Sequence, residues 1–364
     1  MNNVAEIIRA AIAEQGAISF VRFMELALYC PLYGYYEKKE DTPGRRGDFY
    51  TSVSVGSLFG ELLAFQFAEW LEAEGRNQKS EVRMAEAGAH DGRLAKDILN
   101  WLHLQRPELF ELVEYCIVEP SARRQAWQAE TLHEFGGKVR WVANLKTIAP
   151  RSICGVIFSN ELLDALPVHR LGWDANQREW FEWGVTVANE RFAWIRLPNP
   201  FHASCFTLHV LPELLAVLPD GFTTEICPTA GNWWRAAAGL LERGKLLTLD
   251  YGLAAEGFFA PNRASGTLRA YRQHRVSDDV LANAGEQDIT AHVNFTAIER
   301  VGEAAGLRTE AIVPQAQFLT DIARRAWHEG SGFGAWTEEH TRQFQSLTHP
   351  EHLGRAFRAL IQSR

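Results

Sequence analysis

Two kinds of feature are scarce in this 364-residue chain, and each scarcity argues against a class of function. No apolar run approaches the ~18 residues that a membrane-spanning helix needs, so we expect no membrane insertion. Positive charge is in deficit, with 37 basic against 45 acidic residues, which argues against nucleic acid as the main partner. The remaining composition, 46% hydrophobic and 23% charged, is typical of a soluble globular protein.

Motifs for metal and nucleophile chemistry are also missing. No two cysteines have CxxC spacing, and three histidines in one section fit no ligand set, so we expect no metal site. The plain interpretation of the cysteines is buried thiols in a reducing compartment. No G-x-S-x-G segment occurs, which leaves a serine hydrolase unsupported. The histidines are His169, His202 and His209, and the cysteines are Cys30, Cys116, Cys154, Cys205 and Cys227.

The start of the chain, MNNVAEIIRAAIAEQGAISF, lacks the basic head, apolar core and cleavage site of a signal peptide. Its pattern is typical of an amphipathic helix instead. We therefore expect a cytoplasmic protein.

Strands and helices are predicted to alternate from about residue 80 onward. Strands are expected at 82–88, 114–121, 138–142, before Asn160, at 244–252 and at 308–313, and helices at 93–104, 122–135, 230–243 and 295–305. This rhythm favours an α/β fold with a parallel sheet and helices on both faces.

Four sections follow from this pattern. Residues 1–78 are expected to form an N-terminal helical cap with a long loop, and residues 79–167 the first part of the core. Hairpin-like segments with Asn-containing turns predict a β-rich insertion at 168–226. Residues 227–364 would supply the rest of the core and C-terminal helices.

The segment MAEAGAHDGRL, residues 84–94, outlines a cofactor loop between a strand and a helix. A dinucleotide fold would carry G-x-G-x-x-G, whereas this chain has E-x-G-x-x-x-G. An acid before the first glycine would repel a pyrophosphate but suits the ammonium of an amino-acid cofactor, which favours S-adenosyl-L-methionine over NAD. We expect Gly88 to lie closest to the cofactor and Gly92 to let the helix pack near the strand. An ordinary turn is the alternative.

Other polar residues stand where the predicted strands end, and in an open α/β sheet ligands bind at that edge. Glu119 ends the second strand and can accept both hydroxyls of a ribose. Asn144 follows the third strand, Asn160 and Glu161 end the fourth, and Asp250 ends a later one. We predict that Asn144 and Asn160 contact the cofactor, whereas Asp250 is as readily a core-edge acid.

Longer segments resemble the MidA-like family, whose mitochondrial members are complex I assembly factors and protein arginine methyltransferases. They run in order from about Leu26 to Phe318: ALYCPLYGYY, GDFYTSVSVGSLFGELLA, NELLDALPVH and GTLRAYRQHRVSDDVLANAGEQDITAHVNF. The resemblance implies a class I (Rossmann-like) seven-stranded methyltransferase core with an N-terminal helical cap and an inserted β-rich section. It further implies that the loop within residues 1–78 covers the cofactor. It also implies S-adenosyl-L-methionine as cofactor and a protein substrate such as a respiratory-complex subunit.

The resemblance also assigns residues. Two positions depart from the family pattern, since His90 replaces a glycine of the cofactor loop and Asn294 stands where an aspartate is common. We expect the loop to tolerate His90, with either a negative φ or a left-handed one, and we count His90 among the cofactor-binding residues. The matching positions are Asp48, Thr51, Ser52, Glu86, Gly88, Gly92 and Glu119 for the cofactor, with Asn160, Glu161, Asp164, Asp288, Thr290 and His292 in two further motifs.

An arginine acceptor would need carboxylates, because its guanidinium stays protonated and is a poor nucleophile. We predict Glu161 and Asp164 as the catalytic acids, with His292 as a base or an orienting residue. Structural roles for all three, such as a helix cap for Asp164, are the alternatives. A small-molecule methyltransferase, or a non-catalytic assembly or binding protein on the same fold, remains open beside the arginine methyltransferase.

Overall fold

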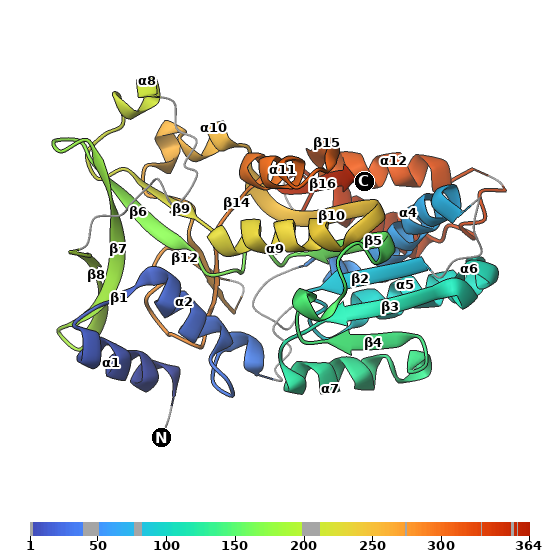
Figure 1. The fold of residues 1–364 in the computed structure, drawn as a ribbon, viewed down its shortest axis with the longest axis horizontal. Coiled ribbons are helices and arrows are strands. Elements are labelled where there is room, and N and C mark those ends of the chain that lie inside the picture. Colours follow the sequence, from blue (N-terminus) through green and yellow to red (C-terminus); the bar gives the residue numbers. More distant parts are fainter. Residues whose placement is uncertain are drawn as a thin grey trace. The chain divides into compact units, whose positions relative to one another are not determined.

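The computed structural model describes residues 3–38, 51–75, 82–198, 212–273, 275–328, 330–350, 353–354 and 356–364. Four residues named above, Asp48, His202, Cys205 and His209, lie outside this set. Tertiary contacts divide the chain into two compact units, labelled by element in Figure 1. Unit 1 comprises Met1–Phe49, Leu163–Asn232 and Gly252–Ile298, and unit 2 comprises Tyr50–Leu162, Trp233–Tyr251 and Glu299–Arg364. These boundaries differ from the four predicted sections.

Unit 2 is built on seven strands of an eight-stranded sheet, whose short eighth strand, β14 (Val293–Asn294), pairs with Gly252 and Leu253 at the end of β10 (Leu241–Leu253). The seven strands pair in the order β15 (Arg308–Pro314), β16 (Phe357–Ser363), β10, β5 (Ile153–Asn160), β2 (Val82–Ala87), β3 (Val113–Val118) and β4 (Val139–Val142). The strands from β4 to β10 are parallel, and β16 runs antiparallel to both β10 and β15. This arrangement confirms the predicted α/β fold with a seven-stranded core.

The C-terminal strand β16 was not predicted, since the sequence analysis closed the core with the strand near 308–313. Six of its seven residues are buried, so the strand shows no alternation of polar and apolar side chains. Its segment, FRALIQS, is also rich in residues that favour helices. Helices do precede it, α12 (Gln315–Ala326) and α13 (Glu338–Thr348). The helix expected at 230–243 is α9 (Pro228–Leu240), and β10 begins directly after it.

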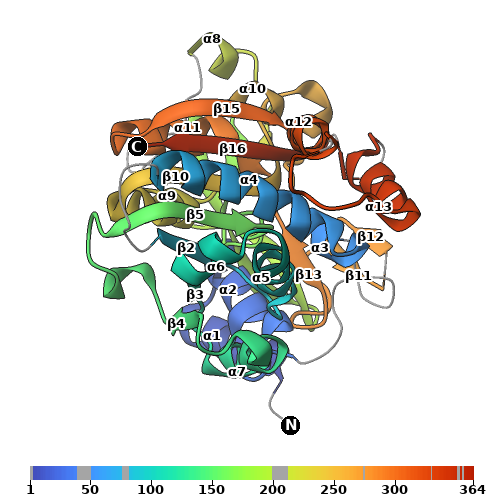
Figure 2. The ribbon, with the colours of Figure 1, turned by 90° about the vertical axis from the view of Figure 1, so that its right-hand side faces the viewer.

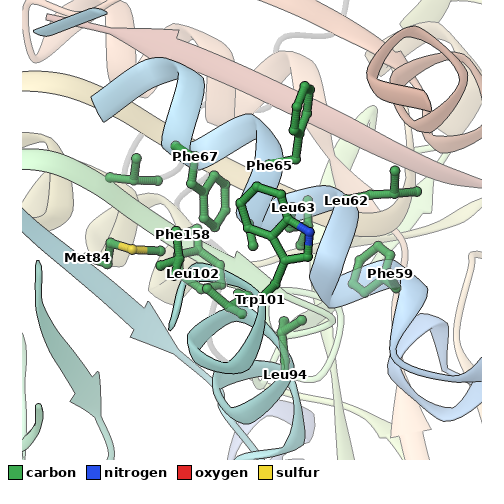
Figure 3. Packing of buried hydrophobic residues seen from close by; sticks show 14 of the residues in the cluster. Phe59, Leu62, Leu63, Phe65, Phe67, Met84, Leu94, Trp101, Leu102 and Phe158 are labelled. Atoms are coloured by element: carbon green, nitrogen blue, oxygen red, sulfur yellow. The ribbon is translucent and has the colours of Figure 1, made fainter. Parts of the chain in front are cut away.

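Helix α4 (Leu58–Gly75) forms the centre of the core of unit 2. It packs against β5, against α5 (Arg93–Gln105) and against α12, as Figure 2 shows. Figure 3 shows Phe67 of this helix beside Phe158 of β5, with 4.9 Å between their ring centroids. Each fully buried side chain of this size contributes about 1.5–3 kcal/mol, so α4 is a structural element of the core. The remaining elements are α3 (Ser52–Val55), α6 (Pro107–Leu112), α7 (Ala122–Thr131), η2 (His133–Phe135), η3 (Leu145–Thr147) and α11 (Phe295–Ala304). The first residues of α11 belong to unit 1.

Unit 1 combines two helices with antiparallel strands. Helix α1 (Val4–Gln15) begins at Asn3, whose side chain accepts a hydrogen bond from the Glu6 amide at 3.0 Å, and α2 (Phe20–Tyr29) follows. One sheet contains β1 (Ile18–Ser19), β7 (Glu179–Ala188), β6 (His169–Asp174) and β9 (Thr223–Ile226), with β8 (Arg191–Arg196) paired to β7. Residues 168–226 therefore contain the antiparallel strands that the sequence predicts.

The stretch 252–298 adds a second, three-stranded sheet to unit 1, in the order β12 (Arg275–Ser277), β11 (Arg269–Arg272) and β13 (Asp288–Thr290). Its shorter elements are α10 (Ala255–Phe258), η5 (Pro261–Arg263) and β14 (Val293–Asn294), while η1 (Tyr35–Glu37) and α8 (Pro212–Leu215) lie elsewhere in the unit. Within the described ranges, no helix has both the length and the apolar character needed to cross a membrane. Nor do three or more metal-ligating side chains gather among those residues.

Candidate functional site

The sheet of unit 2 has a topological switch point between β2 and β5. From β2 the chain proceeds outward to β3 and β4, whereas from β5 it proceeds the other way to β10. Ligands of open α/β sheets bind at such a point, outside the carboxyl ends of the strands. The segments that follow β2 and β5, residues 88–92 and 161–162, therefore define the candidate site.

The loop after β2 depends on left-handed backbone. Gly88 has φ +78°, His90 has φ +47° and Gly92 has φ +85°. Only glycine adopts this region without steric cost, although histidine is among the side chains that enter it more readily. Of the two conformations expected for His90, the left-handed one is present, so its backbone keeps the shape that a glycine would favour.

Two contacts hold His90 in this shape. Its carbonyl oxygen accepts a hydrogen bond from Gln128 Nε2 at 2.9 Å, which ties the loop to α7. Its ring lies beside Asp91, with 3.9 Å between Nδ1 and the carboxylate. Burial raises the pKa of Asp91, but the hydrogen bond and charge of His90, together with the charge of Arg93, outweigh burial and leave it lowered.

Both loop glycines are required for more than φ. A Cβ atom on Gly88 would lie 3.1 Å from Leu162 Cδ1, in the turn after β5. A Cβ atom on Gly92 would lie 3.3 Å from Leu132 Cδ1 and 3.5 Å from the Gln128 backbone. The nearest neighbours of Gly92 thus belong to α7 and to the residue that follows it, while its predicted role in packing the helix near the strand stays a prediction.

Glu86, the acid of the loop motif, is 1% exposed. Its Oε2 accepts a hydrogen bond from the Tyr115 hydroxyl at 2.7 Å. Burial raises the pKa of Glu86 to about 7, with the Tyr115 hydrogen bond opposing the rise and the charge of Asp91 adding to it. A ligand ammonium placed beside this carboxyl would favour its ionised form.

Glu119, directly after β3, is also buried and is held from three sides. Its Oε1 accepts from the Ser121 amide at 2.9 Å, and Oε2 lies 3.3 Å from both Gln128 Nε2 and Arg124 Nε. A carboxylate has about four acceptor positions, so these contacts orient the group and leave capacity on Oε1 for a ribose hydroxyl.

The turn after β5 presents Glu161 with a left-handed backbone, φ +50°. Its Oε1 accepts from the Ser52 amide at 3.0 Å and from Asn160 Nδ2 at 3.2 Å. Since Ser52 lies 109 residues earlier in the sequence, the fold itself fixes the carboxylate. The half-buried Glu161 is thus a positioned acid at the switch point.

Asp250 of β10 stabilises the same turn, a role that the sequence did not indicate. Its fully buried carboxylate accepts from the Leu162 amide at 3.2 Å and from the Tyr251 amide at 2.8 Å. The expected strand end at Asp250 is wrong, because β10 continues to Leu253, but its place near the end of an apolar strand was the available signal. What that signal could not give is the direction in which the carboxylate points.

Three other predicted cofactor contacts have local partners. Thr51 caps α3, with its Oγ1 accepting from the Ser54 amide at 3.0 Å. Ser52 is fully buried, and its hydroxyl donates to Gln315 Oε1 at 3.1 Å. Asn144 is exposed and caps η3 through a bond from the Lys146 amide at 3.0 Å. Their contact with the cofactor stays a prediction.

Asp164 belongs to unit 1, whereas Glu161 belongs to unit 2. The Asp164 carbonyl accepts from the Ala291 amide at 2.9 Å, and its charge contributes to the raised pKa of Tyr36 after burial, Asp288 and Tyr29. The Tyr36 hydroxyl donates to Asp288 Oδ1 at 2.7 Å. Each predicted acid therefore has its described contacts within its own unit.

His292, in unit 1, is a weak base. Burial, followed by the charges of Arg263 and Arg269, lowers its pKa to about 3. Efficient general bases have pKa values near the working pH, so this environment argues against the predicted base role. An orienting role remains, with the His292 amide donating to Thr267 Oγ1 at 3.1 Å. Thr290 is paired with Arg269 in the β11–β13 ladder.

The residues at the switch point fit a nucleoside carrying an amino acid. Glu86 can pair with an ammonium and Glu119 with a ribose, while the left-handed loop gives a ligand close access to the backbone. The side-chain oxygen of Asn160 is buried without a hydrogen-bond partner among the described residues, as expected where a ligand completes the bonding. Together with the seven-stranded core, these features define a class I methyltransferase.

Comparisons with known proteins agree. Residues 62–313 match the model of a family described as "Putative S-adenosyl-L-methionine-dependent methyltransferase". Because this match covers more than half of the chain, the protein belongs to that family, is an enzyme, and uses S-adenosyl-L-methionine. The resemblance inferred from the motifs is thereby confirmed.

Similar proteins cover nearly the whole chain. One is "Protein arginine methyltransferase NDUFAF7 homolog, mitochondrial" of Drosophila melanogaster, 27% identical over 98% of this chain and 84% of the relative. Another is the NDUFAF7 protein arginine methyltransferase of Danio rerio, 26% identical over 98% and 85%. A crystal structure from Burkholderia thailandensis, bound to S-adenosyl-homocysteine, aligns with a TM-score of 0.83 and 32% identity over 99% of this chain and 92% of that chain.

Proposed function

We propose that the enzyme transfers the methyl group of S-adenosyl-L-methionine to an arginine side chain of a protein. The observation that carries this proposal is the Glu161 carboxylate, held at the switch point by the Ser52 amide and by Asn160. The names of the relatives from Drosophila melanogaster and Danio rerio support the same acceptor.

When bound, S-adenosyl-L-methionine supplies a methyl group on a positively charged sulfur. Glu161 would bind the guanidinium of the acceptor through charge-assisted hydrogen bonds and polarise one of its nitrogens. The Ser52 and Asn160 contacts fix the carboxylate before the acceptor arrives, which reduces the entropy lost on reaching the reactive geometry. The same carboxylate can take the proton that the nitrogen loses.

The proposed partner is a protein such as a respiratory-complex subunit, and nucleic acid is not expected to bind. The cytoplasmic location expected from the sequence stays a prediction, and the relatives named above are described as mitochondrial.

Mass spectrometry of native lysate incubated with the enzyme and isotopically labelled S-adenosyl-L-methionine tests the proposal. We expect labelled methylarginine in one or a few proteins with wild-type enzyme and none with Glu161→Gln. Label confined to small molecules, or to a residue other than arginine, would replace the proposal with the corresponding acceptor. Retention of S-adenosyl-homocysteine binding by the variant shows that the loss lies in acceptor chemistry.

A further inference from the structure

Asn160, the last residue of β5, has a side-chain amide whose two ends differ in their bonding. Nδ2 donates to Glu161 Oε1 at 3.2 Å, and this contact sets the orientation of the amide. Oδ1 is buried and has no hydrogen-bond partner among the residues that the structure describes, and the side chain belongs to a residue only 8% exposed. A buried acceptor left without a donor is costly, which indicates an external donor that completes the bonding.

The register of the sheet places Asn160 at the cofactor loop. Ser159 pairs with Ala87 of β2, so Asn160 is level with Gly88, where the loop begins. On the other side, Asn160 pairs with Leu249 of β10. The unpartnered oxygen therefore belongs to a residue at the end of β5, which lies between β2, the strand that leads into the cofactor loop, and β10, the strand that carries Asp250.

An oxygen that can only accept, beside a carboxylate, fits a cationic N–H donor. Two such donors take part in methyl transfer, the ammonium of the cofactor and the nitrogen that becomes methylated. Glu86, buried at the end of β2, already provides a carboxyl group for the ammonium. Asn160, predicted from the sequence to contact the cofactor, then has its Oδ1 left for the other donor.

We propose that Asn160 Oδ1 accepts a hydrogen bond from the nitrogen that receives the methyl group, and that it thereby favours acceptors bearing N–H groups over acceptors that have no hydrogen to donate. The inference rests on the proposed function in one respect, that the acceptor is a nitrogen. It does not require the nitrogen to belong to arginine or to a protein.

In the transfer step, the nitrogen forms a bond to the methyl carbon while the carbon–sulfur bond breaks. The bonding electrons remain on sulfur, which becomes a neutral thioether, and one N–H proton passes to the Glu161 carboxylate. Asn160 Oδ1 holds a second N–H of the same nitrogen or of its neighbour in a guanidinium. This contact turns the nitrogen lone pair toward the methyl carbon, which makes Asn160 a residue of the acceptor site.

Sinefungin tests the proposal without an identified acceptor, because this cofactor analogue carries an amine where the cofactor carries the transferable methyl. S-adenosyl-homocysteine lacks any group at that position but shares the rest of the molecule. Isothermal calorimetry of both ligands therefore isolates the environment of the reacting centre. We expect wild-type enzyme to prefer sinefungin by about tenfold or more, as for a hydrogen bond to a charged group.

Asn160→Leu keeps the shape of the side chain and removes the acceptor. We expect its preference for sinefungin to fall about tenfold while its affinity for S-adenosyl-homocysteine changes little. Asn160→Asp places a carboxylate at the same position, so its preference should equal or exceed that of wild type, a result that misfolding cannot produce. Asn100→Leu, on α5 and outside the site, is the matched control and should behave as wild type.

Three results would overturn the proposal. They are a wild-type enzyme without preference for sinefungin, an Asn160→Leu variant that keeps the preference, or an equal loss of affinity for both ligands, which would assign Asn160 to the ammonium that they share. If Asn160→Leu does not fold by circular dichroism, a reduced preference in Asn160→Asp decides against the proposal. Failure to find methylarginine in lysate would contradict the proposed function and leave these binding results unaffected.

Discussion

The segments after β2 and after β5 meet the same switch point, yet they are built by different means. Each contains a residue other than glycine with left-handed backbone, His90 at φ +47° and Glu161 at φ +50°. After β2 the backbone determines the shape, and the His90 ring is partly exposed beside Asp91. After β5 side-chain hydrogen bonds determine it: the Glu161 carboxylate accepts from the Ser52 amide and from Asn160, and the Asp250 carboxylate accepts from the Leu162 amide.

This difference corresponds to the two functions assigned to this edge of the sheet, cofactor binding by the loop after β2 and acceptor chemistry by the turn after β5. A loop whose shape depends on the backbone tolerates changes of side chain as long as its φ angles do not change. A turn that fixes a carboxylate depends on particular charges and hydrogen bonds. The cofactor loop should therefore respond to steric changes, and the turn after β5 to chemical ones.

The largest effect is expected for Gly88→Val in the backbone-built loop. A β-branched residue is strained at φ +78°, and its Cβ would lie 3.1 Å from Leu162 Cδ1. We expect loss of measurable S-adenosyl-homocysteine binding by calorimetry. Gly137→Val, at a position with nothing within 4 Å of the added Cβ, is the control and should bind normally. Normal binding by Gly88→Val would show that the loop does not contact the cofactor.

Glu161→Gln should have the next largest effect, and a purely chemical one. The amide keeps the size of the side chain but removes the charge, so turnover should fall about a hundredfold to a thousandfold. Binding of S-adenosyl-homocysteine should change little, because the contacts of Glu161 are with Ser52 and Asn160. Single-turnover kinetics with labelled cofactor measures the loss. Unchanged turnover would make Glu161 a structural residue of the turn.

Glu119→Ala should weaken cofactor binding by about 1–3 kcal/mol, since a hydrogen bond to a charged group is lost. The change also leaves Arg124 without the carboxylate that lies 3.3 Å from it. Glu119→Gln, which loses the charge but keeps one acceptor oxygen for the Ser121 amide, should bind with intermediate affinity by calorimetry. Equal affinity of wild type and both variants would remove Glu119 from the ribose site.

Glu86 predicts a dependence of cofactor binding on pH. Its pKa of about 7 means that the carboxyl is mostly protonated at pH 6 and mostly ionised at pH 8. A cationic ammonium binds the ionised form better, so affinity for S-adenosyl-homocysteine should rise by about tenfold from pH 6 to pH 8. Glu86→Gln should flatten the calorimetric profile over this range. A profile that is the same in both proteins would exclude Glu86 as the partner of the ammonium.

Sequence alone predicted the parts of the fold that repeat a simple pattern. The strands ending at Val118 and Asn160 each lead into a glutamate, and the strand ending at Ala87 leads into the first glycine of the loop; these signals located the edge of the sheet. Strand β16 was not predicted because its segment, FRALIQS, is rich in residues that favour helices and lacks the alternation that would identify a strand. The hydrogen bond from the Ser52 amide to Glu161 could not be predicted, because it joins residues that are far apart in the sequence and that only the folded chain brings together.

The sign of φ at His90 also could not be predicted from the sequence, which allowed either conformation.

A substitution at His90 should have the smallest effect. His90→Gly removes a side chain from left-handed backbone, where glycine has no steric cost, and keeps the carbonyl that accepts from Gln128. Cofactor affinity should therefore be equal to that of wild type or slightly higher. Calorimetry with S-adenosyl-homocysteine measures it, and His90→Val, strained at φ +47°, provides the contrast. A marked loss of affinity in His90→Gly would mean that the imidazole itself contacts the cofactor, and the loop after β2 would then depend on side-chain chemistry as the turn after β5 does.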